Sequence, residues 1–241
     1  MSETIEIIGR QQKPEHQLAE RIAQIIDQRP GCLDTELLRE YVVRHLARSS
    51  RYLATWEQNG CQPVYAFDRQ AVTERTTRFR TAFKTYLPQT RFYFAMKSNN
   101  HPEVSRTVCD GGFGLDVSSG IELRTGLQAG ADDIIFSGPG KQDSELRLAL
   151  ANADRVTVLI DSFGELERLT SLADEASVRI RAGIRIVPAG RSSWRKFGIP
   201  VDRLREFWET AAKSPSIDLC GIQFHASWNM DASAQVATLE M

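Results

Sequence analysis

Four polar residues stand at or near the ends of short apolar stretches, and their side chains could together bind a small reactive ligand. They are Lys97, Asp116, Arg185 and His225. A lysine, a carboxylate, a guanidinium and an imidazole around one pocket suit an anionic, aromatic or carbonyl-bearing ligand. A lone lysine in such a position is more often a solvated surface residue. The hypothesis therefore requires that the fold bring all four side chains to one place.

Lys97 has the most distinctive chemistry of the four. It follows the apolar run FYFAM at 92–96 and precedes the polar turn SNNH at 98–101. In a partly dry pocket the charged form of a lysine is disfavoured, which lowers its pKa and frees the amine for Schiff-base formation. Pyridoxal phosphate uses such an amine, because its ring is an electron sink while the protein supplies orientation and charge partners. Lys97 is therefore the candidate attachment point for this cofactor.

The elements that must position these residues alternate between strand and helix. The predicted strands are 92–96, 114–117, 133–136, 156–160, 180–187 and 219–224. Helix starts are predicted between them, with Pro102 in a first turn, Asp143 as a cap, and a capping box from Ser162 to Glu165. Six strand–helix units in this order predict an α/β fold with a parallel sheet, either open and doubly wound or closed as a (β/α) barrel.

The loop after the first strand favours the barrel. An open sheet that binds a dinucleotide has a glycine-rich turn between its first strand and the following helix. Here the first strand is followed by KSNNHP at 97–102, and the glycines at 110–116 lead into a strand instead. A complete barrel takes eight units and about 250 residues, whereas only about 150 residues follow Phe92. We expect an incomplete (β/α)8-type barrel of about six units, with the reactive residues at the carboxyl ends of its strands.

The first part of the chain has a different pattern. Residues 15–58 read as helical, with a break at Pro30-Gly31 and a second helix that starts from a cap at Asp34. We therefore predict two domains, an N-terminal helical extension at 1–60 and a barrel at 61–241. The role of the extension stays open.

Composition limits the classes of partner. The 30 Lys and Arg residues balance 31 Asp and Glu residues, so the net charge of −1 predicts neither nucleic-acid nor membrane binding. The amino terminus has no apolar signal core, and no stretch approaches the roughly 18 apolar residues of a membrane span. The cysteines are far apart and form no C-x-x-C pair. We expect no metal site, reduced thiols and a soluble, cytoplasmic protein.

Six segments, in order, carry a resemblance to a known family. They are FYFAMKSNNHPEV at 92–104, GFGLDVSSGIELRTGLQAGA at 112–131, IIFSGPGKQDSELRLAL at 134–150, VLIDSFGELERL at 158–169, GIRIVPAGRSSWRKFGIP at 183–200 and GIQFHASW at 221–228. They resemble the fold-type III pyridoxal-phosphate enzymes, whose alanine racemase-like barrel carries a YAVKAN segment with the cofactor lysine. The order and the histidine segment are more similar to the decarboxylase branch, which acts on diaminopimelate, ornithine and arginine, than to the racemases.

The resemblance implies a role for each site residue. Lys97 would form the Schiff base, and Asp116 and Arg185 would lie near that lysine and the phenolate oxygen of the cofactor. His225 would stack on the cofactor ring, and Glu122 would support the site from behind. The implied activity is decarboxylation of a small amino-acid substrate by a homodimer of the full-length protein. The resemblance also makes Asp68 the cap of the first barrel helix.

Departures from the family pattern leave alternatives open. Trp228 stands where the family has a serine that helps to hold phosphate. The family's GGG turn, its EPGR glutamate, its carboxy-terminal β-domain and its partner-reaching cysteine do not occur in these 241 residues, so the chain is predicted to be a fragment or a short form. A non-catalytic or regulatory paralogue, and a racemase or aldolase on the same fold, are the alternative functions. Lys141 matches a family lysine, although a solvated loop lysine would have the same pattern.

Overall fold

The computed structural model describes residues 20, 35–187, 197–225 and 236. The predicted break at Pro30-Gly31, the predicted cap at Asp34 and the position of Trp228 lie outside the described residues. The described chain up to Ala66 forms one compact unit, and the chain from Phe67 onward forms another. The extension and barrel domains proposed from the sequence, divided between residues 60 and 61, stay a prediction.

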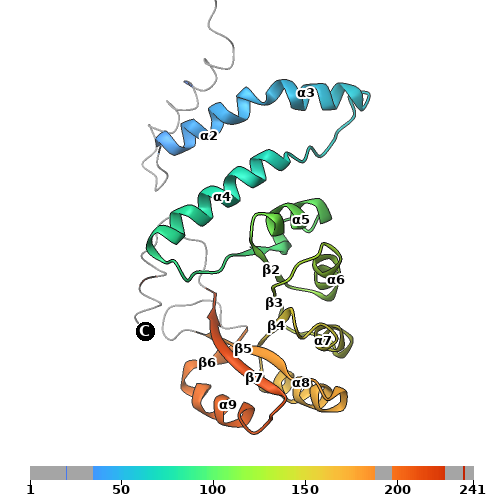
Figure 1. Cartoon of the computed structure of the whole chain (residues 1–241), viewed down its shortest axis with the longest axis vertical. Helices are drawn as coiled ribbons and strands as arrows, with labels where there is room; N and C mark the ends of the chain where they lie inside the picture. The colour runs from blue at the N-terminus through green and yellow to red at the C-terminus, as the bar shows by residue number, and fades with distance from the viewer. Residues whose placement is uncertain (1–19, 21–34, 188–196, 226–235, 237–241) are drawn as a thin grey trace, which may run out of the picture. The chain divides into compact units, whose positions relative to one another are not determined.

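From Thr35 onward, the described part of the first unit has two helices where the sequence predicted one helix from a cap at Asp34. Helix α2 spans Thr35–Ala47 and α3 spans Ser49–Gln58 (Figure 1). Arg48 separates them, and its backbone N–H bonds the carbonyl of His45 in a tight turn. Arg48 offers no side-chain cap to α3, so neither a glycine, a proline nor a capping residue marks this boundary in the sequence.

The second unit opens with helix α4, which spans Arg69–Tyr86. Asp68 caps it, because the backbone N–H of Ala71 donates to Asp68 Oδ1 at 2.9 Å, so the predicted cap is confirmed. The carboxyl half of α4 packs through Phe79 against Phe92, the residue just before the first strand, with ring centroids 5.8 Å apart. This contact fixes the helix against the start of the sheet.

A parallel sheet forms the centre of the second unit. Its strands are β1 (Tyr93–Ala95), β2 (Gly114–Val117), β3 (Ile134–Phe136), β4 (Val156–Ile160), β5 (Ile180–Val187), β6 (Ile199–Pro200) and β7 (Ile217–Phe224). They are ordered β1-β2-β3-β4-β5, and β5 also pairs with β7 from Ile180 to Ile186 and with the short β6 at Ile186 and Val187. The six predicted strands are confirmed to within two residues at each end, and among the strands of the described residues the two-residue β6 is the one that was not predicted.

Helices separate successive strands from β1 to β5, and another lies between β6 and β7, as an α/β fold requires. They are α5 (Pro102–Asp110), α6 (Gly120–Gln128), α7 (Asp143–Leu150), α8 (Phe163–Ala176) and α9 (Leu204–Ala211), with 3₁₀ turns η1 (Met96–Ser98) and η2 (Val201–Arg203). Figure 1 shows α5 to α8 stacked along one side of the strands. The expected α/β architecture, an incomplete barrel built of parallel strand–helix units, is confirmed.

The helix starts follow the sequence signals with two differences. Pro102 is the first residue of α5, as predicted. Asp143 is not a cap: it is the first residue of α7, and Gln142 holds the cap position. The reason is that Glu145 accepts the backbone N–H of Gln142 at 2.9 Å and also that of Gly120, at the start of α6, at 2.6 Å. One carboxylate thereby satisfies the amino ends of two helices.

The start of α8 follows half of the predicted capping box. The backbone N–H of Glu165 donates to Ser162 Oγ at 3.1 Å, which confirms Ser162 as the cap. The carboxylate of Glu165 turns into the interior instead, where it accepts a hydrogen bond from Lys141. In a complete capping box the Glu165 carboxylate would accept the backbone N–H of Ser162. Here it bonds the buried Lys141 instead.

The two faces of the sheet differ in polarity. Residues toward the helices are apolar and almost fully buried; they include Leu115, Val117, Ile134, Phe136, Val156, Val158, Ile160, Ala182 and Ile184. The residues at alternate positions point to the other face. One row of them, paired from strand to strand across β1 to β5, consists of Ala95, Asp116, Ile135, Thr157 and Arg181. This row is only partly buried. The inner face of the incomplete barrel can therefore hold polar groups, which is the face a site needs.

Candidate functional site

The four predicted site residues all lie at the carboxyl end of the parallel sheet. Lys97 is in η1, immediately after β1, and Asp116 is the third residue of β2. Arg185 is the sixth residue of β5, and His225 directly follows β7. In the strand register Asp116 lies beside Ala95, two residues before Lys97. Arg185 lies beside Gln223, two residues before His225, so each pair comes from neighbouring strands.

Electrostatic interactions connect the four side chains. Burial raises the pKa of Asp116, while the hydroxyl of Ser137 and the charges of Lys97 and Arg185 oppose that rise. Burial also lowers the pKa of His225, and Lys97 and Arg185 lower it further while Asp116 acts in the opposite direction. Asp116 and His225 therefore interact electrostatically with each other and with both Lys97 and Arg185. The structure brings the four residues together, as the hypothesis required, and their individual roles stay predictions.

Asp116 has an oxygen available for a further partner. Its Oδ1 is buried and has no hydrogen-bond partner among the described residues. Leaving such an atom unsatisfied costs about 1–3 kcal/mol. Lys97 lies at the end of the neighbouring strand and is exposed, so the partly dry surroundings expected for its amine from the sequence are wrong for this structure. A ligand that donates to Asp116 would remove this cost.

Glu122 supports the loop after β2. Its Oε2 accepts the backbone N–H of Ser118 at 2.7 Å and the Ser118 hydroxyl at 3.0 Å. Glu122 is 8% exposed and lies in the first turn of α6. It therefore fixes the segment that follows Asp116 and faces away from bulk water.

Arg185 has a partner that the sequence did not single out. Its Nη1 lies 3.5 Å from Oδ1 of Asp161, the residue that follows β4. The ring of Phe197 lies 5.3 Å from the guanidinium carbon, which is cation–π geometry. The signal for Asp161 was present in VLIDS at 158–162, a carboxylate at the end of an apolar strand, the same pattern that identified the other site residues.

The structure contradicts the interpretation of Lys141 as a solvated loop lysine. It is 2% exposed, and its Nζ donates to the carbonyl of Leu159 at 2.6 Å and to Glu165 Oε1 at 2.8 Å. The Phe136 ring lies 5.1 Å from the same nitrogen. Burial lowers the pKa of Lys141, and the facing carboxylate of Glu165 offsets part of that effect. A buried cation of this kind must be paired.

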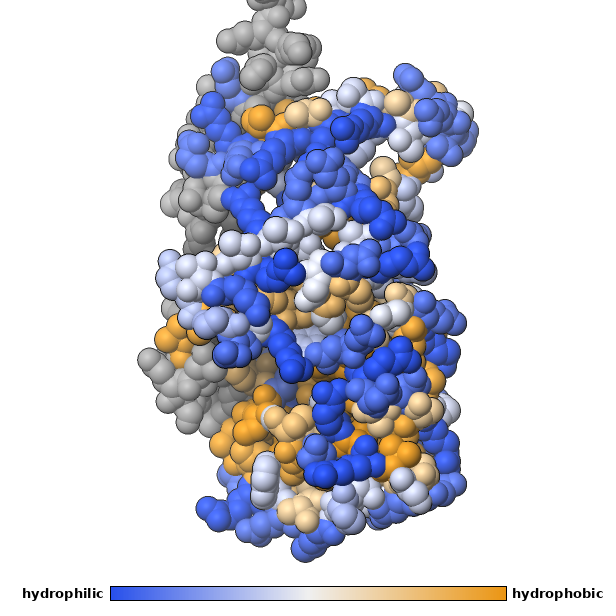
Figure 2. All heavy atoms as spheres, in the orientation of Figure 1, coloured by the Kyte–Doolittle hydropathy of each residue, from blue (hydrophilic) through white to orange (hydrophobic). Residues whose placement is uncertain are grey.

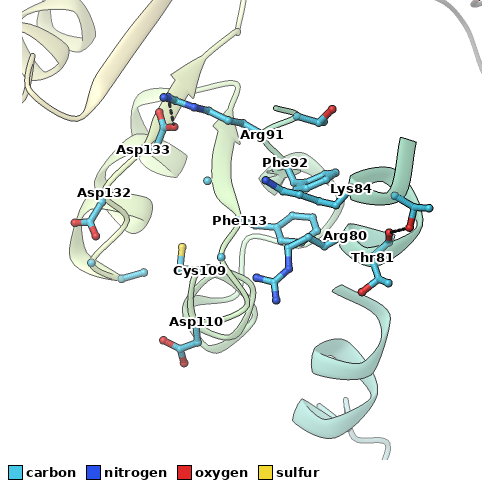
Figure 3. Close-up of a pocket in the computed structure, with 16 residues that line it drawn as sticks. Arg80, Thr81, Lys84, Arg91, Phe92, Cys109, Asp110, Phe113, Asp132 and Asp133 are labelled. Atoms are coloured by element: carbon cyan, nitrogen blue, oxygen red, sulfur yellow. Dashed lines mark hydrogen bonds and ion pairs between the residues drawn. The ribbon is translucent and has the colours of Figure 1, made fainter. Parts of the chain in front are cut away.

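A separate cavity of about 970 Å³ lies at the opposite end of the strands (Figure 3). Phe92, just before β1, lines it together with Arg80 and Lys84 of α4. Figure 3 also shows Arg91 paired with Asp133 at its rim. None of the four predicted site residues lines this cavity. This cavity is therefore separate from the site that the chemistry of the residues indicates.

Comparison with known proteins places the chain. Residues 69–240 match the family described as "Pyridoxal-dependent decarboxylase, pyridoxal binding domain". The chain belongs to this family. The predicted relationship to the pyridoxal-phosphate decarboxylases is thereby confirmed, and pyridoxal phosphate is confirmed as the cofactor of the family.

Curated members of the pyridoxal-dependent decarboxylase family are similar over much of the chain. An ornithine decarboxylase of Leishmania donovani is 35% identical over 182 residues, which cover 73% of this chain and 25% of that protein. A diaminopimelate decarboxylase of Campylobacter jejuni is 30% identical over 175 residues, covering 68% of this chain and 43% of that protein. The chain thus spans less than half the length of these relatives.

Solved structures of decarboxylases share the fold. A lysine/ornithine decarboxylase of Vibrio vulnificus complexed with putrescine is 26% identical, with a TM-score of 0.60 over 74% of this chain and 45% of that chain. The Paramecium bursaria Chlorella virus arginine decarboxylase is 23% identical and shows the fold, with a TM-score of 0.65 over 79% of this chain and 52% of that chain.

No group of three or more His, Cys, Asp or Glu side chains in the described part of the chain is arranged to hold a metal ion. Within the same part, no helix is both long and apolar enough to cross a bilayer. The cytoplasmic location stays a prediction.

Proposed function

We propose that the protein is a pyridoxal-phosphate-dependent amino-acid decarboxylase in which Lys97 binds the cofactor covalently. One observation carries the proposal: Lys97, Asp116, Arg185 and His225 come from four separate elements and meet at the carboxyl end of one parallel sheet. That end of a (β/α) barrel is where active sites are built. Membership of the pyridoxal-dependent decarboxylase family supports the same assignment.

The residues present fit the cofactor. The unpartnered, buried Oδ1 of Asp116 calls for a donor, and the exposed amine of Lys97 is accessible to an aldehyde. Bound there, the cofactor would supply an electron sink for the electron pair that remains when carbon dioxide leaves an amino acid. Lys97 would hold the cofactor until the amine of the substrate takes the place of the lysine amine on it. Asp116 and Arg185 would orient the lysine and the phenolate oxygen, and His225 would contact the ring.

The charges around the pocket suit this task. Two cations, Lys97 and Arg185, favour a phosphate-bearing and carboxylate-bearing ligand. They also lower the pKa of His225, so the imidazole is favoured in its neutral form. A neutral imidazole can lie against an aromatic ring without bringing a third positive charge to the site.

We also propose a basic or amino-dicarboxylic amino acid as the substrate, and a homodimer as the assembly of the full-length protein. The names of the relatives support the substrate class, since they include ornithine and diaminopimelate decarboxylases. The homodimer rests on the family resemblance.

Absorption and chemical trapping test the assignment of Lys97. The full chain mixed with pyridoxal phosphate should develop a visible absorption band, and borohydride should abolish the band and fix the cofactor on the peptide that contains Lys97. Lys97→Ala should lose both signals. Lys213→Ala, at an exposed lysine after α9, is the matched control and should keep them. Trapping of the cofactor on a different lysine would refute the assignment.

Carbon dioxide release then separates a catalyst from a binding protein. Ornithine, lysine, arginine and diaminopimelate should be offered to the full chain carrying the cofactor. Release from one of them that depends on Lys97 supports the decarboxylase. A normal absorption band with no release from any of the four would favour the binding or regulatory alternative.

A further inference from the structure

Asp161 is a carboxylate at the candidate site to which the proposed function gives no role. It directly follows β4 and precedes Ser162, the cap of α8. Its side chain is 11% exposed, and that of Arg185 on the neighbouring strand is 16% exposed. The two charges therefore face each other largely out of water, where an ion pair orients its members more strongly than it does at the surface.

Two contacts restrict the guanidinium of Arg185, one with Asp161 and one with Phe197. Asp161 lies 3.5 Å from its Nη1, and the ring of Phe197 lies 5.3 Å from its carbon. Asp161 also accepts the backbone N–H of Gly198, the residue after Phe197. Asp161 thus contacts the guanidinium of Arg185 and also the backbone of Gly198. Gly198 follows Phe197, whose ring packs on the same guanidinium.

Gly198 allows this arrangement because it has no side chain. Its φ is +102°, a conformation that L residues rarely adopt. A Cβ there would meet the carbonyl oxygen of Arg185 at 3.0 Å and the carbonyl carbon of Ile186 at 3.1 Å. The backbone at Gly198 therefore lies directly against β5 at the position of Arg185, and its N–H reaches Asp161.

The buried Lys141 secures the segment that carries Asp161. Its Nζ bonds the carbonyl of Leu159, two residues before Asp161, and the carboxylate of Glu165, four residues after it. The strand end and the first turn of α8 are fastened to the same nitrogen. Asp161 therefore projects from a turn that is held on both sides.

We propose that Asp161 is a positioning residue that orients the guanidinium of Arg185 toward the candidate site formed with Lys97, Asp116 and His225. This inference rests on the proposed function for its effect on cofactor binding, and on the structure alone for its effect on Arg185. A carboxylate that only neutralised a buried arginine would contribute to folding and leave ligand binding unchanged. A positioning carboxylate must act on the ligand through Arg185.

The first experiment needs no cofactor. Hydrogen exchange of the Arg185 guanidinium is followed by NMR in the full chain, with its resonances identified by their loss in Arg185→Lys. Asp161→Asn keeps the shape and removes the charge. Because the charged partner restrains the guanidinium, we expect exchange roughly tenfold faster in this variant. Asp143→Asn, which removes the exposed partner of Arg168, is the matched control and should leave Arg185 unchanged.

The second experiment is a double-mutant cycle on the affinity for pyridoxal phosphate, read from the visible band. Asp161→Asn and Arg185→Met should each weaken binding by roughly tenfold, and the double variant should be no weaker than Arg185→Met alone, because coupled residues are not additive. Equal losses from Asp161→Asn in both backgrounds would show that Asp161 does not act through Arg185 and would overturn the proposal.

The two experiments separate the possible failures. If the unaltered chain binds no cofactor at Lys97, the proposed function fails and the exchange measurement alone decides the orientation of Arg185. If the cofactor binds and Arg185 exchanges at the same rate with and without the Asp161 charge, the positioning role is wrong while the proposed function stands.

Discussion

Lys141 Nζ and Glu165 Oε1 form an ion pair 2.8 Å long, and their side chains are 1% and 2% exposed. The pair joins the loop after β3 to the first turn of α8. The carbonyl of Leu159 accepts a second hydrogen bond from the same nitrogen, which compensates part of the cost of burying the charge.

Removing one member of this pair should strongly destabilise the chain. Lys141→Met leaves the Glu165 carboxylate buried without its cation, and breaking a buried pair costs about 3–5 kcal/mol. Urea unfolding measures the loss. Lys141→Met combined with Glu165→Leu should be less destabilising than Lys141→Met alone, because no buried charge remains. The exposed pair of Arg147 and Glu175 is the control, and Arg147→Met should cost less than about 1 kcal/mol. Equal losses at the two sites would contradict the burial of Lys141.

Gly198→Ala should destabilise the chain and disturb Arg185. The alanine would occupy a φ of +102° and press its Cβ against the backbone of β5. Such strain costs about 1–3 kcal/mol. Gly164→Ala, in the first turn of α8 where a Cβ meets nothing within 4 Å, is the matched control. It should be neutral or stabilising by up to about 1 kcal/mol. Unfolding midpoints that move together in the two variants would speak against the close approach.

The stability of the cofactor-free chain should depend on the protonation of Asp116. Burial raises its pKa, so the folded chain binds this proton more tightly than the unfolded chain does. The contribution of the acid form is fully present below the ordinary aspartate pKa of about 3.9 and is lost as the pH rises through the raised value. Asp116→Asn has no such titration. Urea unfolding across this pH range should therefore show the variant gaining stability relative to the unaltered chain as the pH rises. A difference that is independent of pH would contradict the raised pKa.

NMR titration of His225 should report the charges around it. Burial, Lys97 and Arg185 lower the pKa of His225, and Asp116 raises it. Arg185→Met should therefore raise this pKa, and Asp116→Asn should lower it further. His225→Gln identifies the resonance. If both variants leave the titration unchanged, the four residues do not share one electrostatic site.

Cys109 should be slow to alkylate. Burial raises its pKa to about 11, and the carboxylates of Asp110 and Asp132 act in the same direction. Because the thiolate is the reactive form, iodoacetamide near neutral pH should modify Cys109 at least about tenfold more slowly than the exposed Cys61. Peptide mass spectrometry follows each residue. In urea the difference should disappear, and a rapid reaction of Cys109 in the folded chain would contradict its burial.

Local signals predicted most of the second unit. Apolar runs located the strands because the helix-facing positions must be buried, and Pro102 and Ser162 marked helix starts within a few residues, whereas the cap at Asp68 came from the family resemblance. The candidate site residues were chosen in the same way, since a polar side chain after a buried strand lies at the carboxyl end of the sheet, and their roles stay predictions.

Features that depend on distant partners were not predictable locally. The burial of Lys141 depends on Glu165, 24 residues away, and the importance of Asp161 depends on Arg185, also 24 residues away. The division of the first unit at Arg48 has no capping residue to announce it. In Figure 2 hydrophobic residues gather over β7, where Ile222 is 57% exposed, and the strand pattern alone could not say which face would be left uncovered.

The carboxylate of Glu145 couples the unfolding of α6 to that of α7. It ties the amino end of α7 to that of α6, and a Cβ on Gly120 would lie 2.7 Å from Glu145 Cγ, so the two helices meet without room for adjustment. Neither helix can fray at its amino end without releasing its neighbour. The two helices should therefore unfold as a single cooperative unit, with matching protection of their amide protons from hydrogen exchange.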